Sequence, residues 1–127
     1  MNFSIGRSWF GLPATVNSQQ KLIGVSLSMY GDQAKTHYHL LLQDKAAIEA
    51  EFGEPLSWEE LPGKKESRLA VRRPNSDPGM KSDWPQQFAW MREKLERFDN
   101  VFRDRVKALD TSQRISPSVV EDEPQPV

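Results

Sequence analysis

The sequence predicts an α+β fold with two layers, in which a small antiparallel sheet carries two helices on one face. Two periodic segments are the main evidence for this fold class. In residues 22–30, apolar side chains alternate with Gly and Ser, which is the period of a half-buried strand. In residues 83–109, apolar side chains recur every three or four positions, which is the period of an amphipathic helix. The segments around these two give the order β-β-α-β-β-α.

The first two strands are predicted at residues 9–12 and 22–30. The segment between them, residues 13–21, is polar and contains a proline, an asparagine and two glutamines. Its length favours a hairpin with a loose loop over a tight turn.

One long helix is predicted next, over residues 33–52, because its apolar side chains have helical spacing. The carboxylate of Asp32 is suited to accept hydrogen bonds from the first free amides of this helix. Gly53 is suited to the left-handed position that follows a helix C-terminus. The alternative is a strand at residues 37–42, followed by a shorter helix that Asp44 caps.

A second hairpin is predicted from strands at residues 56–61 and 67–72, joined by a segment that begins with a Pro-Gly turn dipeptide. In the second of these strands Leu69 and Val71 are expected to face the core. The arginines and the alanine between them are expected to face away.

The last helix, residues 83–109, has two different faces. Asp83 begins a capping box and Pro85 stands in the first turn, where its missing N–H is tolerated. Trp84 is expected near the core. The face predicted to pack on the core contains Phe88, Met91, Leu95, Phe98, Phe102, Val106 and Leu109. About a quarter turn away lies a basic strip without an acid, formed by Trp90, Lys94, Arg97, Val101 and Arg105.

The composition is that of a globular protein with a polar surface. The 127 residues are predicted to form one domain over residues 1–110 and a disordered, acidic, Pro-rich tail over residues 111–127. The chain has no cysteine, so disulfides and thiolate metal sites are excluded. It has no apolar run of membrane-spanning length and no signal-peptide pattern at its start. We therefore expect a cytoplasmic protein without a membrane contact, a metal or a cofactor.

Charge is distributed unevenly along the chain, although the formal net charge is only −1. Residues 44–60 hold six acids and one base, whereas residues 64–107 hold twelve bases and seven acids. The overall balance argues against indiscriminate binding of nucleic acid, and a local basic surface remains compatible with it.

The first functional hypothesis is a non-catalytic accessory domain that binds DNA or RNA or docks onto a nucleic-acid-processing protein. Lys94, Arg97 and Arg105 would contact phosphates, and Trp90 would stack on bases. The basic surface would be extended by Arg68, Arg72 and Arg73 if their strand lies beside the helix. The alternative for Trp90 is a widened buried face next to Val101, and the alternative for the arginines is an ordinary solvated strand.

Two rival hypotheses come from other classes of protein. A protein-interaction or homo-oligomerisation domain would bury Trp90 and Val101 against another chain. A divalent-metal nuclease would use Glu59, Glu60, Lys64 and Lys65, but the acids and lysines do not form the acid-x-lysine triplet of such sites. His37 and His39 would lie on different sides of the predicted helix and could not chelate one ion together.

A family resemblance rests on several motifs that occur in order along the chain. Ile48-Glu49 and Gly53 precede Leu56-Ser57-Trp58-Glu59, then Lys65-Glu66-Ser67-Arg68-Leu69 and a tryptophan-containing last helix. This pattern resembles the bacterial and archaeal family named domain of unknown function 4268. Many members form the C-terminal part of proteins whose N-terminal part is similar to a restriction-type nuclease. The resemblance implies an accessory role in DNA-processing or defence systems, with a nuclease-type protein as partner, and it implies no catalytic residue. The 127 residues leave no room for that nuclease domain, so the chain is either a free-standing copy or one domain of a larger protein.

Overall fold

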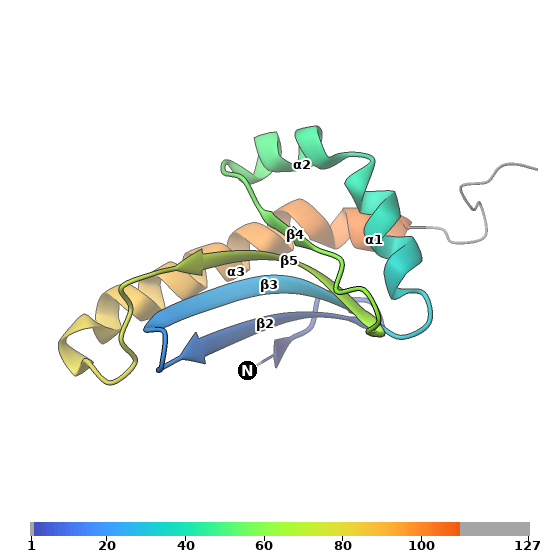
Figure 1. Ribbon diagram of the computed structural model, residues 1–127. Coiled ribbons are helices and arrows are strands. Elements are labelled where there is room, and N and C mark those ends of the chain that lie inside the picture. The colour runs from blue at the N-terminus through green and yellow to red at the C-terminus, as the bar shows by residue number, and fades with distance from the viewer. Residues whose placement is uncertain (1, 110–127) are drawn as a thin grey trace, which may run out of the picture.

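The computed structural model describes residues 2–109, and they form a five-stranded antiparallel sheet with three α-helices (Figure 1). The sheet order is β1-β2-β3-β5-β4. The strands are β1 (Asn2–Phe3), β2 (Phe10–Asn17), β3 (Leu22–Tyr30), β4 (Ser57–Glu59) and β5 (Glu66–Arg73). The helices are α1 (Ala34–Leu42), α2 (Lys45–Phe52), a short 3-10 turn η1 (Lys81–Asp83) and α3 (Trp84–Ala108). The predicted α+β class is confirmed, with one additional edge strand and one additional helix.

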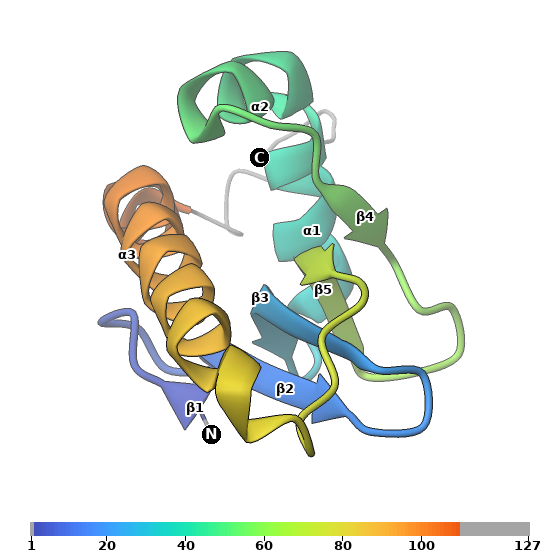
Figure 2. The ribbon, with the colours of Figure 1, turned by 90° about the vertical axis from the view of Figure 1, so that its left-hand side faces the viewer.

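The central strand β3 follows the period-two pattern of its sequence. Its apolar residues are buried on the inner face, and Leu27 pairs there with Leu69 of β5. Gly24, Ser26 and Ser28 lie on the outer face, which none of the helices within residues 2–109 covers. Figure 2 shows α1 and α3 over the same face of the sheet, with α2 above them. Leu69 and Val71 face the core as predicted.

Strand β2 is longer than the sequence suggested. The predicted loose loop over residues 13–21 is wrong, because β2 continues to Asn17 and only four residues join it to β3. The side chain of Asn17 accepts a hydrogen bond from the backbone of Gln20 at 2.9 Å and closes this turn. Pro13, the first residue of the predicted loop, lacks an N–H and cannot donate to a neighbouring strand. It is tolerated here within β2, where it is paired in register with Asn2 of the short edge strand β1.

The predicted single helix over residues 33–52 is wrong in one respect, because it is broken at Gln43 and Asp44 into α1 and α2. Helix α1 buries its apolar face on β3 and β5, whereas α2 packs on α3. One straight helix cannot cover both partners, so the chain turns after Leu41, whose carbonyl accepts from Asp44 N at 2.9 Å. The alternative strand at residues 37–42 is also wrong, although its shorter second helix is present.

The predicted helix ends were partly correct. Gly53 follows α2 with φ of 95°, the left-handed conformation expected of it. Pro85 stands in the first turn of α3 as predicted. Neither Asp32 nor Asp83 makes a capping hydrogen bond from its side chain. Asp32 instead forms an ion pair with Lys65, and Asp83 accepts from Arg73 and Gln87.

Helix α3 is rotated relative to the predicted packing. Phe98, Phe102 and Val106 are buried as expected. Phe88 and Trp84, both expected in the core, are instead 59% and 36% exposed. The length of α3 is one reason for this exposure. Its 25 residues span roughly 37 Å, whereas a strand of eight or nine residues spans roughly 30 Å. The first turns of α3 therefore extend beyond the face that the sheet can cover.

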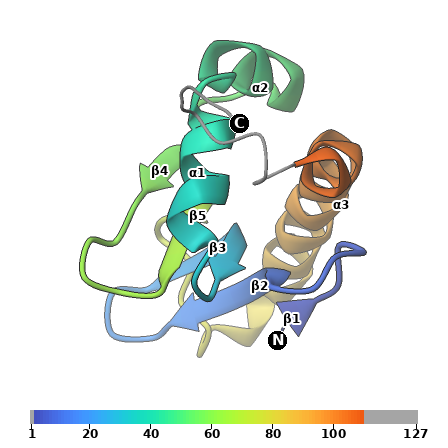
Figure 3. The same cartoon turned by 90° about the vertical axis from the view of Figure 1, so that its right-hand side faces the viewer.

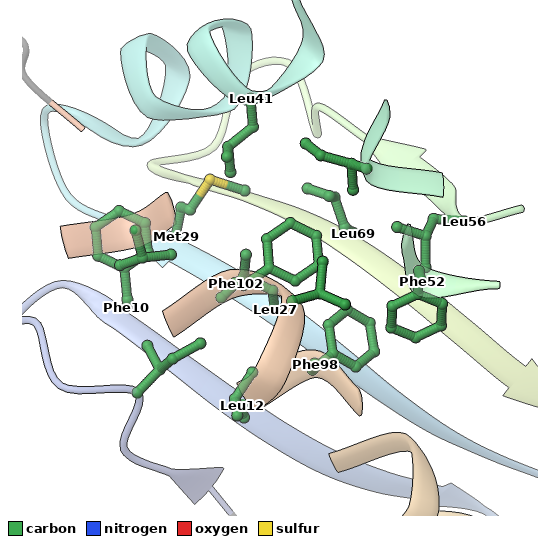
Figure 4. Close-up of a cluster of buried hydrophobic side chains, with 14 of the residues drawn as sticks. Phe10, Leu12, Leu27, Met29, Leu41, Phe52, Leu56, Leu69, Phe98 and Phe102 are labelled. Carbon is green, nitrogen blue, oxygen red and sulfur yellow. The ribbon is translucent and has the colours of Figure 1, made fainter. Parts of the chain in front are cut away.

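One hydrophobic core joins all the layers (Figure 4). Phe98 lies between Phe52 of α2, with ring centroids 4.8 Å apart, and Phe102, at 5.7 Å. Leu27 and Leu69 come from the sheet below these rings, and Leu41 comes from α1. The three helices thus share one core with the inner face of the sheet.

The predicted tail over residues 111–127 lies outside the described residues. Among residues 2–109, no helix is long and apolar enough to cross a membrane.

Candidate functional site

The basic strip of α3 faces the acidic helix α2. Lys94 Nζ lies 2.5 Å from Glu54 Oε2, and Lys94 is only 9% exposed. Arg105 Nη2 lies 2.9 Å from Glu51 Oε1. Arg97 also pairs with Glu54, at 3.6 Å, and donates to a backbone carbonyl at the end of α2. The charges of the strip are therefore matched by acids from residues 44–60, which the sequence had shown as a separate acidic segment.

The two apolar members of the strip are also engaged within the molecule. Val101 is buried, and Trp90 is half-buried against the core. Lys94 Nζ lies 6.0 Å from the centre of the Trp90 ring. This arrangement agrees with the buried-face alternative for Trp90 and Val101. Binding of nucleic acid through these residues stays a prediction.

The three arginines of β5 do not join the strip. Arg68 and Arg72 lie on the outer face of the sheet, where both pair with Glu59 of β4 at 2.8 and 2.6 Å. These contacts, with the hydrogen bond from Arg72 as the largest, lower the pKa of Glu59 from 4.5 to about 2. Arg73 points to the other side and contacts Asp83 at 3.2 Å. The sheet therefore separates Arg68 and Arg72 from the strip on α3.

The residues considered for a nuclease are also dispersed. Glu59 is held by the two arginines, and Glu60 lies 3.3 Å from His39. Lys65 pairs with Asp32. Within residues 2–109 no group of three or more acidic or histidine side chains is arranged to hold a metal ion.

The opposite flank of α3 carries an exposed apolar surface, and two of its side chains, Trp84 and Phe88, were predicted to lie in or near the core. Trp84 and Phe88 have ring centroids 6.0 Å apart. The indole of Trp84 is anchored through a hydrogen bond from Nε1 to the carbonyl of Pro78 at 2.8 Å. Met80, just before the helix, is 54% exposed, and Phe3 of β1 is 41% exposed. The sequence held one indication of this exposure. The predicted last helix is longer than the predicted strands, so the sheet cannot cover all of its apolar side chains.

A hollow of about 490 Å³ continues this surface between α3 and β1. Its apolar floor is formed by Phe3, Leu12 and Leu95. Charged and polar side chains line it as well, namely Arg92, Glu96, Asp99 and Asn100. We call Phe3, Met80, Trp84, Phe88 and Leu95, together with this hollow, the docking face.

Comparison with known proteins gives one match. No curated protein and no solved structure matches the chain. The family model described as Domain of unknown function (DUF4268) matches residues 1–106, which include every strand of the sheet and nearly all of α3. The chain therefore belongs to the family Domain of unknown function (DUF4268).

Proposed function

We propose that this chain is a non-catalytic protein-docking domain, and that the docking face binds a second copy of the chain. The observation that supports this proposal is the exposure of Trp84 and Phe88 on the same flank of α3 as a hollow with both apolar and charged walls. Large aromatic side chains are common anchors of protein interfaces, and contiguous apolar surface of this kind is rare where nothing binds. A docking domain fits the accessory role that the family resemblance implies.

The shape of the docking face favours a second copy as the occupant. The protruding ring of Phe88 and the hollow around Leu95 lie on the same flank of α3, seven residues apart, or roughly 10 Å along the helix. A two-fold axis between them would bring the Phe88 of each copy to the hollow of the other. The rim of the hollow carries both signs of charge, with Arg92 near Glu96 and Asp99, so two antiparallel copies can pair these charges.

Nucleic acid is the rival occupant. Lys81 lies 5.8 Å from the ring centre of Trp84, and Arg92 lies further along the same helix, so aromatic and basic side chains do occur together here. The local charge argues against this occupant, because residues 80–100 hold four bases and four acids. A surface without net positive charge gives little of the phosphate attraction on which such binding depends.

Sedimentation equilibrium over a range of concentrations tests the proposal. We expect the wild-type chain to dimerise and Phe88→Glu to remain monomeric, because the change places a charge in the apolar contact. Ala89→Glu is the matched control. It adds the same charge one residue along, on an exposed position turned about 100° around the helix, and it should dimerise like the wild type.

A wild-type chain that is monomeric at every concentration would overturn the second copy as occupant, as would equal dimerisation of the two glutamate variants. Fluorescence anisotropy with labelled single- and double-stranded DNA at two salt concentrations tests the rival. Salt-dependent binding that Phe88→Glu abolishes, with Ala89→Glu unaffected, would assign the face to nucleic acid and contradict protein docking.

A further inference from the structure

A second hollow, of about 560 Å³, lies where β3 turns into α1. Figure 3 views the molecule from this end, with the start of α3 at the far end. Three separate segments line it: the residues before β2, the turn from β3 into α1, and the turn before β5. Its main side chains are Arg7, Trp9, Tyr30, Asp32, His37 and Lys65. Its volume falls within the range of small-molecule sites. None of the functional hypotheses from the sequence used these residues as a group.

Backbone hydrogen bonds tie the three segments together. Tyr30 N donates to the carbonyl of Trp9 at 2.8 Å, and Gly31 N donates to that of Lys65 at 3.0 Å. The guanidinium of Arg7 donates to the carbonyls of Val106 and Leu109 at the end of α3, at 2.6 and 2.8 Å. The backbone around the hollow and the side chain of Arg7 are therefore held in place by hydrogen bonds, which lowers the entropic cost of binding.

Trp9 combines an exposed aromatic side chain with an unfavourable backbone conformation. It is 67% exposed, and its φ of 71° lies in the left-handed region, which bulky residues rarely adopt. Its indole lies close to Gly31, where a Cβ would stand 3.1 Å from Trp9 Cε3. Gly31 itself has φ of 85°. Strained backbone conformations cost free energy and cluster at functional sites. The packing of an exposed ring does not offset that cost, so this arrangement is typical of a binding site.

His37 is buried without a hydrogen-bond partner. It is 4% exposed on the inner side of α1, with its ring 4.8 Å from that of Phe10. Neither Nδ1 nor Nε2 has a partner among residues 2–109. Burial, and then the charge of Arg7, lower the pKa of His37 below 6.5, so the imidazole is neutral and offers one donor and one acceptor. Buried polar groups are nearly always satisfied, so an unpaired imidazole lining a hollow indicates a missing partner.

We propose that this hollow binds a small ligand that combines a planar ring bearing hydrogen-bond donors and acceptors with an anionic group, the chemistry of a nucleoside monophosphate. The ring stacks on Trp9, and its polar edge bonds with His37 after the imidazole turns toward the hollow, because both ring nitrogens are otherwise buried. The anionic group faces the guanidinium of Arg7, which keeps N–H donors beyond the one nitrogen used at the end of α3. Lys65 adds a second cation, which it shares with the carboxylate of Asp32 at 2.8 Å. This site is independent of the docking face, because the two share no residue.

The test is a nuclear magnetic resonance titration that follows the ring nitrogens of His37 and the indole N–H of Trp9. The probes are adenosine monophosphate, uridine monophosphate, adenosine and inorganic phosphate. We expect saturable shifts at both residues with at least one nucleotide, weaker binding of adenosine and the weakest binding of phosphate alone. No saturable shift with either nucleotide would overturn the proposal, and so would phosphate binding as tightly as the nucleotides.

Two variants separate a binding role from a structural one. His37→Phe keeps the ring and removes the unpaired nitrogens, so its melting temperature should be equal to or above that of the wild type, while its affinity for the nucleotide falls at least tenfold. Trp9→Leu should lose affinity to a similar degree. Trp84→Leu, which removes a partly exposed tryptophan at the other end of the sheet, should bind as the wild type does. Unchanged affinity in both His37→Phe and Trp9→Leu would contradict the assignment.

Discussion

The carboxylate of Glu49 accepts a hydrogen bond from the indole Nε1 of Trp58 at 3.0 Å. The same oxygen accepts from the backbone N of Leu56 at 2.9 Å, and these two contacts lower the pKa of Glu49. They hold the end of α2 against β4, where Trp58 packs edge-on against Tyr38. Glu49, Leu56 and Trp58 are among the residues that carry the family resemblance. That part of the shared motif therefore builds the scaffold, which explains why it identifies the family without indicating an activity.

We expect Glu49→Ala to lower the free energy of unfolding by about 1–2 kcal/mol, because both donors lose their acceptor. Urea denaturation measures this loss. Glu51→Ala is the matched control, since Glu51 forms an ion pair at the surface and should cost less than about 1 kcal/mol. Equal losses in the two variants would show that the Glu49 contacts do not stabilise the α2–β4 connection.

The acid stability of the fold should depend on Glu59. Its pKa is lower in the folded chain, at about 2, than its ordinary value of 4.5. The ion pairs with Arg68 and Arg72 therefore stabilise the fold above about pH 4.5, and this contribution is lost as the pH falls toward 2. We expect Glu59→Gln to lower the free energy of unfolding by about 2 kcal/mol at pH 7 and to weaken its dependence on pH below 4.5.

Glu60→Gln, one residue further along, is the control for this pH dependence. Within residues 2–109, the carboxylate of Glu60 has a hydrogen bond only with the exposed His39. Denaturation at a series of pH values should show wild-type behaviour for this variant. A Glu59→Gln chain with the same acid sensitivity as the wild type would contradict the role of the two arginines.

The pair formed by Lys94 and Glu54 should be strongly coupled. Glu54→Gln leaves a nearly buried ammonium without its counter-charge and should cost about 2 kcal/mol. Lys94→Met fills similar space without a charge. In a double-mutant cycle measured by urea denaturation, we expect the double variant to be more stable than the sum of the single effects predicts, by about 1 kcal/mol. Strict additivity would show that α2 and α3 are held together without this pair.

Two phenylalanines of α3 should differ sharply in their contribution to stability. Phe98 is fully buried between Phe52 and Phe102, so Phe98→Ala should cost about 3–5 kcal/mol, and Phe98→Asp should unfold the domain. Phe88 is exposed, so Phe88→Ala should change the free energy of unfolding by less than about 0.5 kcal/mol. Thermal and urea denaturation measure both. Similar losses would mean that α3 packs on the sheet through the face that the sequence alone predicted.

Local patterns predicted the parts of the fold that depend on neighbouring residues. The alternation in residues 22–30 located β3, and the helical period of residues 83–109 located α3, because each element must bury one continuous face. Gly53 ended α2 as predicted, since only glycine readily adopts its left-handed conformation. The same patterns failed at Gln43 and Asp44, where two helices of the same period meet and only their packing partners differ.

The pairing of charges on the surface, and the residues that meet in a hollow, depend on the tertiary structure. The sequence by itself determined that α3 has an apolar face and a basic strip, and that an acidic segment precedes them. It did not determine that Glu51 of α2 meets Arg105, or that Glu54, just after α2, meets Lys94, because those contacts join residues 54 and 40 positions apart. The sequence also did not predict that Trp9 and His37 line the same hollow. Charge pairing and the assembly of a site depend on which elements meet in space. The periodicity of the sequence indicates the face that each element buries, but not the element that it packs against.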